Sequence, residues 1–350
     1  MTPLQALVGI ELPIVQAPMA GVQGSALAVE VCSAGGLGSL PCAMLGLDAM
    51  RDELSAIKAR TSRPFNVNFF CHTPPAPDAA RETVWRTALA PYYREFGLDV
   101  NAVPAGAGRA PFSPEAADVL GEFRPAVVSF HFGLPSAALL ARVRAWGSKI
   151  FSSATTVDEA RWLEAQGVDA IIAQGVEAGG HRGMFLSDDL TRQVGTFALV
   201  PQIVKAVRTP VIAAGGIADA GGVAAALALG ASGAQIGTAY LLCPEATTSA
   251  VHRAALASEM SRHTALTNLF TGRPARGIVN RLMRELGPMS SAPPAFPLAT
   301  SAIAPLRGKA ESRGSGDFSP LWAGQNATGC REVAAGQLTR ELAGMLRTPR

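Results

Sequence analysis

Short runs of apolar residues recur along the whole chain, and each ends at a glycine, a proline or a polar residue. The runs are too apolar for one face to meet water, which is typical of parallel strands covered by helices. Helical patterns fill most of the gaps, at spacings that suit repeated strand–helix units. We therefore predict an α/β fold, a TIM-type (β/α)8 barrel, with strands at residues 14–19, 37–40, 65–70, 127–132, 150–154, 170–173, 211–214 and 233–237.

Several of the helices between these runs carry their own start signals. Residues 48–60 place apolar side chains on one helical face. Thr156, followed three residues later by Glu159, predicts a capping box, and Asp219 predicts the start of a helix over 221–229. These signals favour alternating strands and helices throughout the barrel.

A doubly wound open sheet is the alternative fold. Such sheets that bind dinucleotides carry a GxGxxG motif directly after the first strand. Residues 21–24, which read GVQG, are only a loose echo of that motif. The closed barrel is therefore the preferred fold.

Two stretches interrupt the strand–helix rhythm and suggest the domain organisation. We predict a barrel over 1–243, with an insertion at 72–114 after the third strand, on the catalytic face. A smaller, mainly helical second domain over 244–317 covers the barrel mouth, and 318–350 returns to the barrel and ends in a helix. Within the second domain, 249–269 reads as helical and 288–316, rich in Pro, Ala, Ser and Gly, as irregular.

Composition narrows the classes of function. Of the 350 residues 48% are hydrophobic and 16% charged, which favours a folded globular chain. The net charge of +3 comes from scattered basic residues, so we predict no nucleic-acid partner. There is no leader-like start and no apolar run near the length of a membrane span, so we predict a cytoplasmic protein without membrane association. Five widely spaced cysteines suit free thiols in a reducing compartment rather than a zinc site.

The ends of the predicted strands carry the candidate chemistry. In a barrel the carboxyl ends of the strands converge on one face, so the residues that follow them share a pocket. A Gly-Gly turn at 215–216 and the hydroxyl of Thr238 follow the last two strands, where barrels hold phosphate. Asn68 and Gln174 can hydrogen-bond the edge of a flat ring, and Met19 offers it an apolar contact. This combination predicts a site for flavin mononucleotide (FMN).

Histidines are the candidate proton acceptors. His181 lies among glycines in the loop after the sixth strand, which favours a general base. His131 ends the fourth strand, where it either lines the pocket or satisfies a buried hydrogen bond. We expect His252 and His263 on the surface and His72 in a structural role. No Asp, Glu or Cys accompanies His181 at ligand spacing, so we predict no metal site.

Six segments, in order along almost the whole chain, resemble the nitronate monooxygenases, formerly called 2-nitropropane dioxygenases. The AGGHRG and GAQIGT stretches are the most specific part of the resemblance. The segments are IVQAPMAGV (14–22), FNVNFF (65–70), AQGVEAGGHRG (173–183), PVIAAGGIAD (210–219), GAQIGTAYL (233–241) and LWAGQ (321–325).

The resemblance implies FMN bound non-covalently in a barrel. It also implies that His181 takes the α-proton of neutral nitroalkanes or assists nitronate oxidation. His131 and Phe296 would edge the substrate pocket, with Phe296 where the first class of the family often carries a tyrosine, and Gln325 would close the pocket. The FMN contacts that the resemblance implies are Pro18, Met19, Asn68, Gln174, Gly179, Gly180, Gly216, Gln235, Gly237, Thr238 and Gln325.

The implied reaction is the conversion of an alkyl nitronate, or of a neutral nitroalkane, and O₂ to a carbonyl compound and nitrite. An NAD(P)H-dependent FMN reductase acting on quinones or enoyl thioesters is an alternative, because other flavin enzymes share this barrel. A non-catalytic flavin-binding barrel is a further alternative. The sequence also leaves the oligomeric state open, with a homodimer as one alternative.

Overall fold

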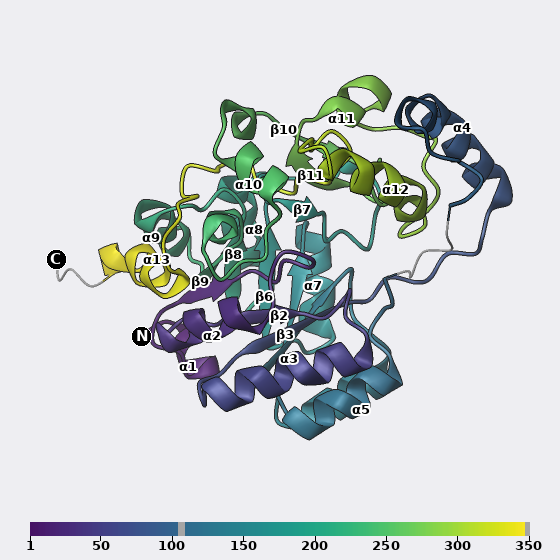
Figure 1. Ribbon diagram of the computed structural model, residues 1–350. Helices are drawn as coiled ribbons and strands as arrows, with labels where there is room; N and C mark the ends of the chain where they lie inside the picture. Colours follow the sequence, from purple (N-terminus) through teal and green to yellow (C-terminus); the bar gives the residue numbers. More distant parts are fainter. Residues whose placement is uncertain (104–108, 347–350) are drawn as a thin grey trace.

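An eight-stranded parallel sheet forms the body of the molecule (Figure 1). The structure, a computed structural model, describes residues 1–103 and 109–346, so parts of the predicted insertion and of the C-terminal segment lie outside the described residues. Neighbouring strands follow the order β1-β9-β8-β6-β5-β4-β3-β2. The strands are β1 (Ile14–Gln16), β2 (Ser39–Pro41), β3 (Asn66–Phe70), β4 (Val127–His131), β5 (Lys149–Ala154), β6 (Ala170–Gln174), β8 (Val211–Ala214) and β9 (Gly233–Ile236).

A parallel bridge between Val15 and Leu37 joins the two end strands and closes the sheet into a barrel. The amide of Leu37 donates to the carbonyl of Ile14, and the amide of Gln16 donates to the carbonyl of Leu37. The predicted (β/α)8 fold is therefore confirmed.

Helices surround the barrel because most strands are followed by a helix that returns the chain to the start of the next strand. The predicted C-terminal helix begins at Ala335, and its Leu338 belongs to the same apolar cluster as Leu27, in the helix that follows β1. The helices of this layer are α2 (Ser25–Ser33), α3 (Leu47–Arg60), α5 (Pro114–Phe123), α6 (Ala137–Ala145), α7 (Val157–Ala165), α8 (Thr196–Ala206), α9 (Ala220–Ala228) and α13 (Ala335–Leu342), with short 3-10 turns η1 (Leu190–Arg192), η2 (Thr238–Leu242) and η4 (Gly344–Leu346). Before the first strand, α1 (Pro3–Val8) packs its Leu4 into the cluster that contains Val15.

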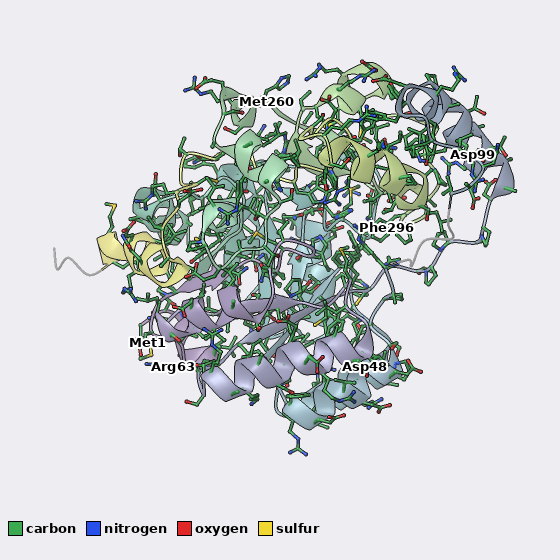
Figure 2. All side chains as sticks on the ribbon, in the orientation of Figure 1. Met1, Asp48, Arg63, Asp99, Met260 and Phe296 are labelled. Carbon is green, nitrogen blue, oxygen red and sulfur yellow. The ribbon has the colours of Figure 1, made fainter. Side chains whose placement is uncertain are left out.

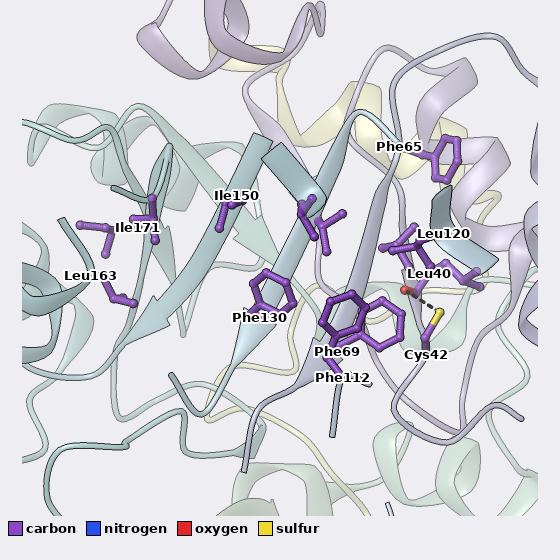
Figure 3. Close-up of a cluster of buried hydrophobic side chains, with 14 of the residues drawn as sticks. Leu40, Cys42, Phe65, Phe69, Phe112, Leu120, Phe130, Ile150, Leu163 and Ile171 are labelled. Atoms are coloured by element: carbon purple, nitrogen blue, oxygen red, sulfur yellow. Dashed lines mark hydrogen bonds between the residues drawn. The ribbon is translucent and has the colours of Figure 1, made fainter. Parts of the chain in front are cut away.

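Side chains alternate along each strand between two apolar layers. On β5, Ile150 joins the layer between strands and helices, while its neighbour Phe151 belongs to a separate cluster with Val15 and Ile212. Figure 3 shows the first layer, in which Phe130 and Ile150 lie among the strands. Each fully buried side chain of this size contributes roughly 1.5–3 kcal/mol of transfer free energy, which explains why both faces of the strands read as apolar.

A second group of elements covers the carboxyl ends of the strands and contains a small sheet that the sequence patterns do not predict. In this sheet β11 (Ala275–Ile278) pairs antiparallel with both β10 (Thr264–Thr267) and β7 (Gly180–His181). The remaining elements are α4 (Ala79–Phe96), α10 (Ala250–Leu256), η3 (Glu259–Arg262), α11 (Arg281–Leu286) and α12 (Ala299–Glu311).

Two expectations for this region are wrong. The stretch 249–269 is helical over α10 and the short 3-10 turn η3 and then forms β10, whose β-branched Thr264 and Thr267 suit a strand. The stretch 288–316 is not irregular throughout, because α12 occupies much of it. Its buried Ala299, Ala302 and Ile303 follow helical spacing, and Pro305 within the helix obscures that pattern.

The described helices include none that is long and apolar enough to cross a membrane. All five cysteines are free thiols, as predicted, and three of them are fully buried. They are Cys32, Cys42 and Cys243, with Cys71 and Cys330 partly buried.

Candidate active site

A cavity of about 1360 Å³, its open mouth included, lies at the carboxyl ends of the barrel strands. Loops after most of the strands and the C-terminal return line it together. The structure brings nearly all the predicted site residues to this one cavity, namely Pro18, Met19, Asn68, His131, Gln174, Gly179, Gly180, His181, Gly216, Gln235, Gly237 and Thr238.

Two predicted residues are placed differently. Gln325 is exposed and does not line the cavity, although Gly324 and Asn326 on either side of it do. Phe296 is buried behind the lining, and its ring centroid lies 5.3 Å from that of His181. In Figure 2 Phe296 lies between α12 and the barrel, which suits a residue at the junction of the two parts.

His181 belongs to the strand β7, which pairs with β11, so an antiparallel ladder rather than a free loop holds its main chain. Its Nε2 lies 3.0 Å from Oγ1 of Thr271. Burial, reinforced by the positive charges of Arg109 and Arg273, holds the pKa of His181 well below 6.5. The imidazole is therefore neutral at neutral pH and has a lone pair with which to accept a proton.

Two side chains hold the main chain of His181 by its carbonyl oxygen. His131 Nε2 donates to this oxygen at 3.1 Å and Gln174 Nε2 donates to it at 3.0 Å. The amide of Gly183 donates to Oε1 of Gln174 at 2.8 Å, so Gln174 spans both sides of the histidine. Because Nε2 of His131 must carry a proton, its Nδ1 accepts from the hydroxyl of Ser153 at 2.9 Å.

The two readings of His131 left open by the sequence are therefore both correct. The residue lines the cavity and also satisfies buried hydrogen bonds. Burial lowers the pKa of His131 to about 4, so this ring is neutral at neutral pH as well.

Arg182, next to His181, is a structural residue that the sequence patterns do not reveal. Its guanidinium is fully buried and donates to the carbonyls of Gln174 and Gly175, each at 2.7 Å, and to Oε1 of Gln193. Burial lowers the pKa of Arg182 to about 10, which leaves it protonated at neutral pH. A buried cation without these acceptors would cost several kcal/mol, so Arg182 must keep them. Through these hydrogen bonds Arg182 holds the end of β6 against the strand that contains His181.

Glu159 supports the other end of this segment, and here the predicted capping box is only half formed. The Thr156 hydroxyl accepts from the amide of Glu159, as a cap should. The Glu159 carboxylate, however, is buried and accepts from the amides of Thr155 and Phe185, each at 2.6 Å, instead of the amide of Thr156. The side chain thus anchors the chain just beyond His181.

The glycine turn after β8 lines the cavity in a backbone conformation that depends on its two glycines. Gly215 and Gly216 have φ values of 120° and 72°, a conformation that other residues rarely adopt. Thr238 Oγ1 accepts from the amide of Gly324 at 2.9 Å, which leaves its own hydroxyl proton free to donate. The side chain of Asn326 donates to the carbonyl of Gly216 at 2.9 Å and ties the C-terminal return to this turn.

An orphaned polar atom lies close by. Oε1 of Gln235 is buried, lines the same cavity and has no hydrogen-bond partner among the described residues. Asn68 uses its side-chain nitrogen on Ser129, at 2.9 Å to Oγ, which leaves its oxygen available. Both oxygens are acceptors, so they suit a ligand that presents N–H or O–H donors.

A cluster of aromatic rings packs behind Phe70 and His181, two residues that line the cavity. Phe132 packs against Phe70, Phe296 and His181, and it adopts φ = 69°, the left-handed region that a bulky residue avoids. The guanidinium of Arg273 lies 4.1 Å from the centroid of the Phe132 ring. Such strain costs on the order of 1–3 kcal/mol, and the packing of the Phe132 ring against these neighbours offsets it.

Several lining residues are not predicted from the sequence. Arg109 belongs to the predicted insertion and Trp322 to the LWAGQ segment, and no periodic pattern points either one at the cavity. His252 was expected on the surface but is only 5% exposed and lines the cavity, with Nε2 lacking a partner among the described residues. The error arises because α10 packs its buried side against the site. His263 is exposed, as predicted.

Comparison with known proteins places this site in a family. The nitronate monooxygenase family model matches residues 1–344. A nitronate monooxygenase of Paraburkholderia phytofirmans is 44% identical over 97% of this chain and 93% of its own length. A second, from Pseudomonas aeruginosa, is 42% identical over 97% of this chain and 98% of its own.

A solved structure agrees with the sequence relatives. The nitroalkane oxidase from Streptomyces ansochromogenes superimposes with a TM-score of 0.89 at 42% identity, over 99% of this chain and 98% of that one. The family model, the sequence relatives and this solved structure all match the part of the chain that contains the cavity. The chain is therefore an oxidoreductase that belongs to the nitronate monooxygenase family.

Proposed function

We propose that this protein binds FMN and uses O₂ to oxidise alkyl nitronates to a carbonyl compound and nitrite. The observation that carries the proposal is one cavity lined both by the neutral imidazole of His181 and by the Gly215–Gly216 turn. Family membership supports nitronate oxidation as the reaction class.

The residues on the page fit FMN. The Gly215–Gly216 turn and the Thr238 hydroxyl would hold its phosphate, as loops after the last two barrel strands commonly do. The orphaned Oε1 of Gln235 and the free side-chain oxygen of Asn68 would accept from the N–H groups of the ring system. When bound, FMN supplies the redox chemistry, and the protein supplies binding and orientation.

His181 has two tasks in this proposal. The Thr271 hydroxyl can donate to the carbonyl of Arg273, 3.4 Å away, and it then accepts from Nε2–H of His181. That arrangement leaves Nδ1 of His181 as the base, which takes the α-proton of a neutral nitroalkane and so forms the nitronate. With a substrate that is already a nitronate, the same ring positions the anion by a hydrogen bond.

Replacing His181 by Asn tests the assignment. A positioned general base contributes roughly 100- to 10,000-fold, so kcat/KM for nitroethane should fall by that order, while FMN content and ethyl nitronate turnover change much less. His263→Asn, at an exposed histidine, is the matched control and should behave as wild type. Full nitroethane activity in the His181 variant would show that the base lies elsewhere.

The alternative functions have their own readout. Anaerobic mixing with NADH bleaches the flavin of an NAD(P)H-dependent reductase, whereas a nitronate monooxygenase responds to ethyl nitronate instead. Rapid bleaching by NADH together with no response to the nitronate would refute the proposal. A protein that binds FMN and responds to neither would be a flavin-binding barrel without this activity.

A further inference from the structure

The cavity carries an unbalanced positive charge. Among the described residues that line it, Arg109 is the only one with a permanently charged side chain, and the lining contains no Asp, Glu or Lys. Burial lowers the pKa of Arg109 to about 10, which still leaves the guanidinium protonated at neutral pH. An enclosed site with one net cation attracts an anion.

Nothing in the described part of the chain neutralises this cation. Arg109 donates to Oγ1 of Thr300 at 3.2 Å and lies 5.8 Å from the centroid of the Phe296 ring, and both partners are uncharged. None of the ion pairs between described residues includes it. A guanidinium has five N–H donors, so donors remain for a ligand.

Arg109 also lies near the reacting end of the cavity. The Phe296 ring is shared, because it contacts Arg109 on one side and His181, at 5.3 Å between centroids, on another. The charge of Arg109 acts directly on the imidazole, where it disfavours protonation more than the other neighbouring charges do. A cation and a neutral imidazole that share one cavity suit a small planar anion held by both.

We propose that Arg109 binds the oxygens of the nitronate group and thereby selects anionic nitronates over neutral nitroalkanes. The planar guanidinium matches two oxygens on one planar centre, as it does in carboxylate recognition. The proposal rests on the proposed function, and it names the residue that sets the preference for the charged form of the substrate.

Three variants of the FMN-loaded protein test it. Arg109→Met removes the charge and keeps an unbranched side chain, and Arg109→Lys restores a charge without the planar fork. Arg313→Met is the matched control, because Arg313 also lies over an aromatic ring, Phe96, at 5.0 Å but is exposed. FMN content and urea unfolding of each variant show whether the fold is kept.

The first measurement is the affinity for nitrate, an inert planar anion, by titration calorimetry. The second is the ratio of kcat/KM for ethyl nitronate to that for nitroethane. Hydrogen bonds to a charged group are lost in Arg109→Met, so we expect roughly 10- to 100-fold weaker nitrate binding and a similar fall in the ratio. Arg109→Lys should recover part of both, and Arg313→Met should change neither.

Unchanged nitrate affinity and an unchanged ratio in Arg109→Met would overturn the proposal. So would an equal loss for both substrates, which would assign Arg109 to folding or to FMN binding instead. The nitrate arm does not depend on turnover. If wild-type protein fails to oxidise ethyl nitronate, the proposed function fails, while loss of nitrate binding in Arg109→Met would still establish the anion site.

Discussion

Replacing Gln174 by Met should disorder the histidine strand while leaving the barrel folded. Met keeps the length of the side chain and removes its amide, which donates to the carbonyl of His181 at 3.0 Å and accepts from the amide of Gly183 at 2.8 Å. His181 keeps its second donor, His131, at 3.1 Å. The buried Gly183 amide keeps no acceptor among the described side chains.

The size of the effect follows from these two losses. The hydrogen bond to His181 contributes about 0.5–1.5 kcal/mol, and an unsatisfied buried donor costs about 1–3 kcal/mol, so the free energy of unfolding should fall by about 1.5–4.5 kcal/mol. If half of this loss reaches the transition state through a misplaced imidazole, kcat/KM for nitroethane falls roughly 4- to 45-fold.

Urea unfolding and steady-state kinetics measure the two effects separately. Gln166→Met, at an exposed glutamine at the end of α7, is the control and should change neither. A double variant with His131→Leu adds a sharper test, because the His181 carbonyl then loses both donors and the free-energy loss should exceed the sum of the single losses by about 1 kcal/mol. If the stability and activity of Gln174→Met match those of the wild type within experimental error, Gln174 does not hold the histidine strand.

Two further predictions concern the glycines and pH. A Cβ on Gly179 would lie 2.6 Å from backbone atoms of the 321–325 segment, so Gly179→Ala should lose FMN binding. A Cβ on Gly180 meets nothing within 4 Å, so Gly180→Ala should cost only about 1–2 kcal/mol of stability, as its φ of 70° implies. FMN titration and urea unfolding distinguish the two variants. Burial lowers the pKa of His131 and of His252 to about 4, below the 6.5 of an unfolded chain. As the pH falls, the unfolded state therefore binds protons before the folded state does. The contribution of these histidines to stability is complete above pH 6.5 and decreases as the pH drops from 6.5 towards 4. The variant His252→Phe should show a smaller decrease when urea unfolding at pH 5 is compared with that at pH 7. An unaltered pH slope in the His252 variant, or normal FMN binding by Gly179→Ala, would contradict these expectations.

The barrel and the floor of its site were predictable for one physical reason. Parallel strands covered on both faces must be apolar, and their carboxyl ends must converge, so Asn68, Gln174 and Thr238 could be assigned to one cavity from their order alone. The glycine–histidine segment followed from the same rule, because it begins where β6 ends.

The part of the cavity lining that comes from outside the barrel strands was not predictable in this way. Arg109, His252 and Trp322 reach the cavity through packing between elements distant in sequence, which leaves no periodic signal in any one segment. Two residues are too few for strand alternation, so β7 could not be recognised, and neither could its ladder with β11. Buried Arg182 was equally hidden, because a charged residue beside glycines reads as a solvated loop.

The ladder between β7 and β11 means that the barrel cannot be separated from the covering region, or combined with that of a relative, without affecting His181. Gly180 and His181 pair with Arg276 and Ala275, so the main chain of the candidate base is aligned by a strand that comes about a hundred residues later. A chain ending at residue 243 would contain every barrel strand and His181 itself, yet it would lack the template that orients the histidine. Exchanging the covering region between relatives to alter substrate range therefore also changes the support of the base, and the two properties have to vary together.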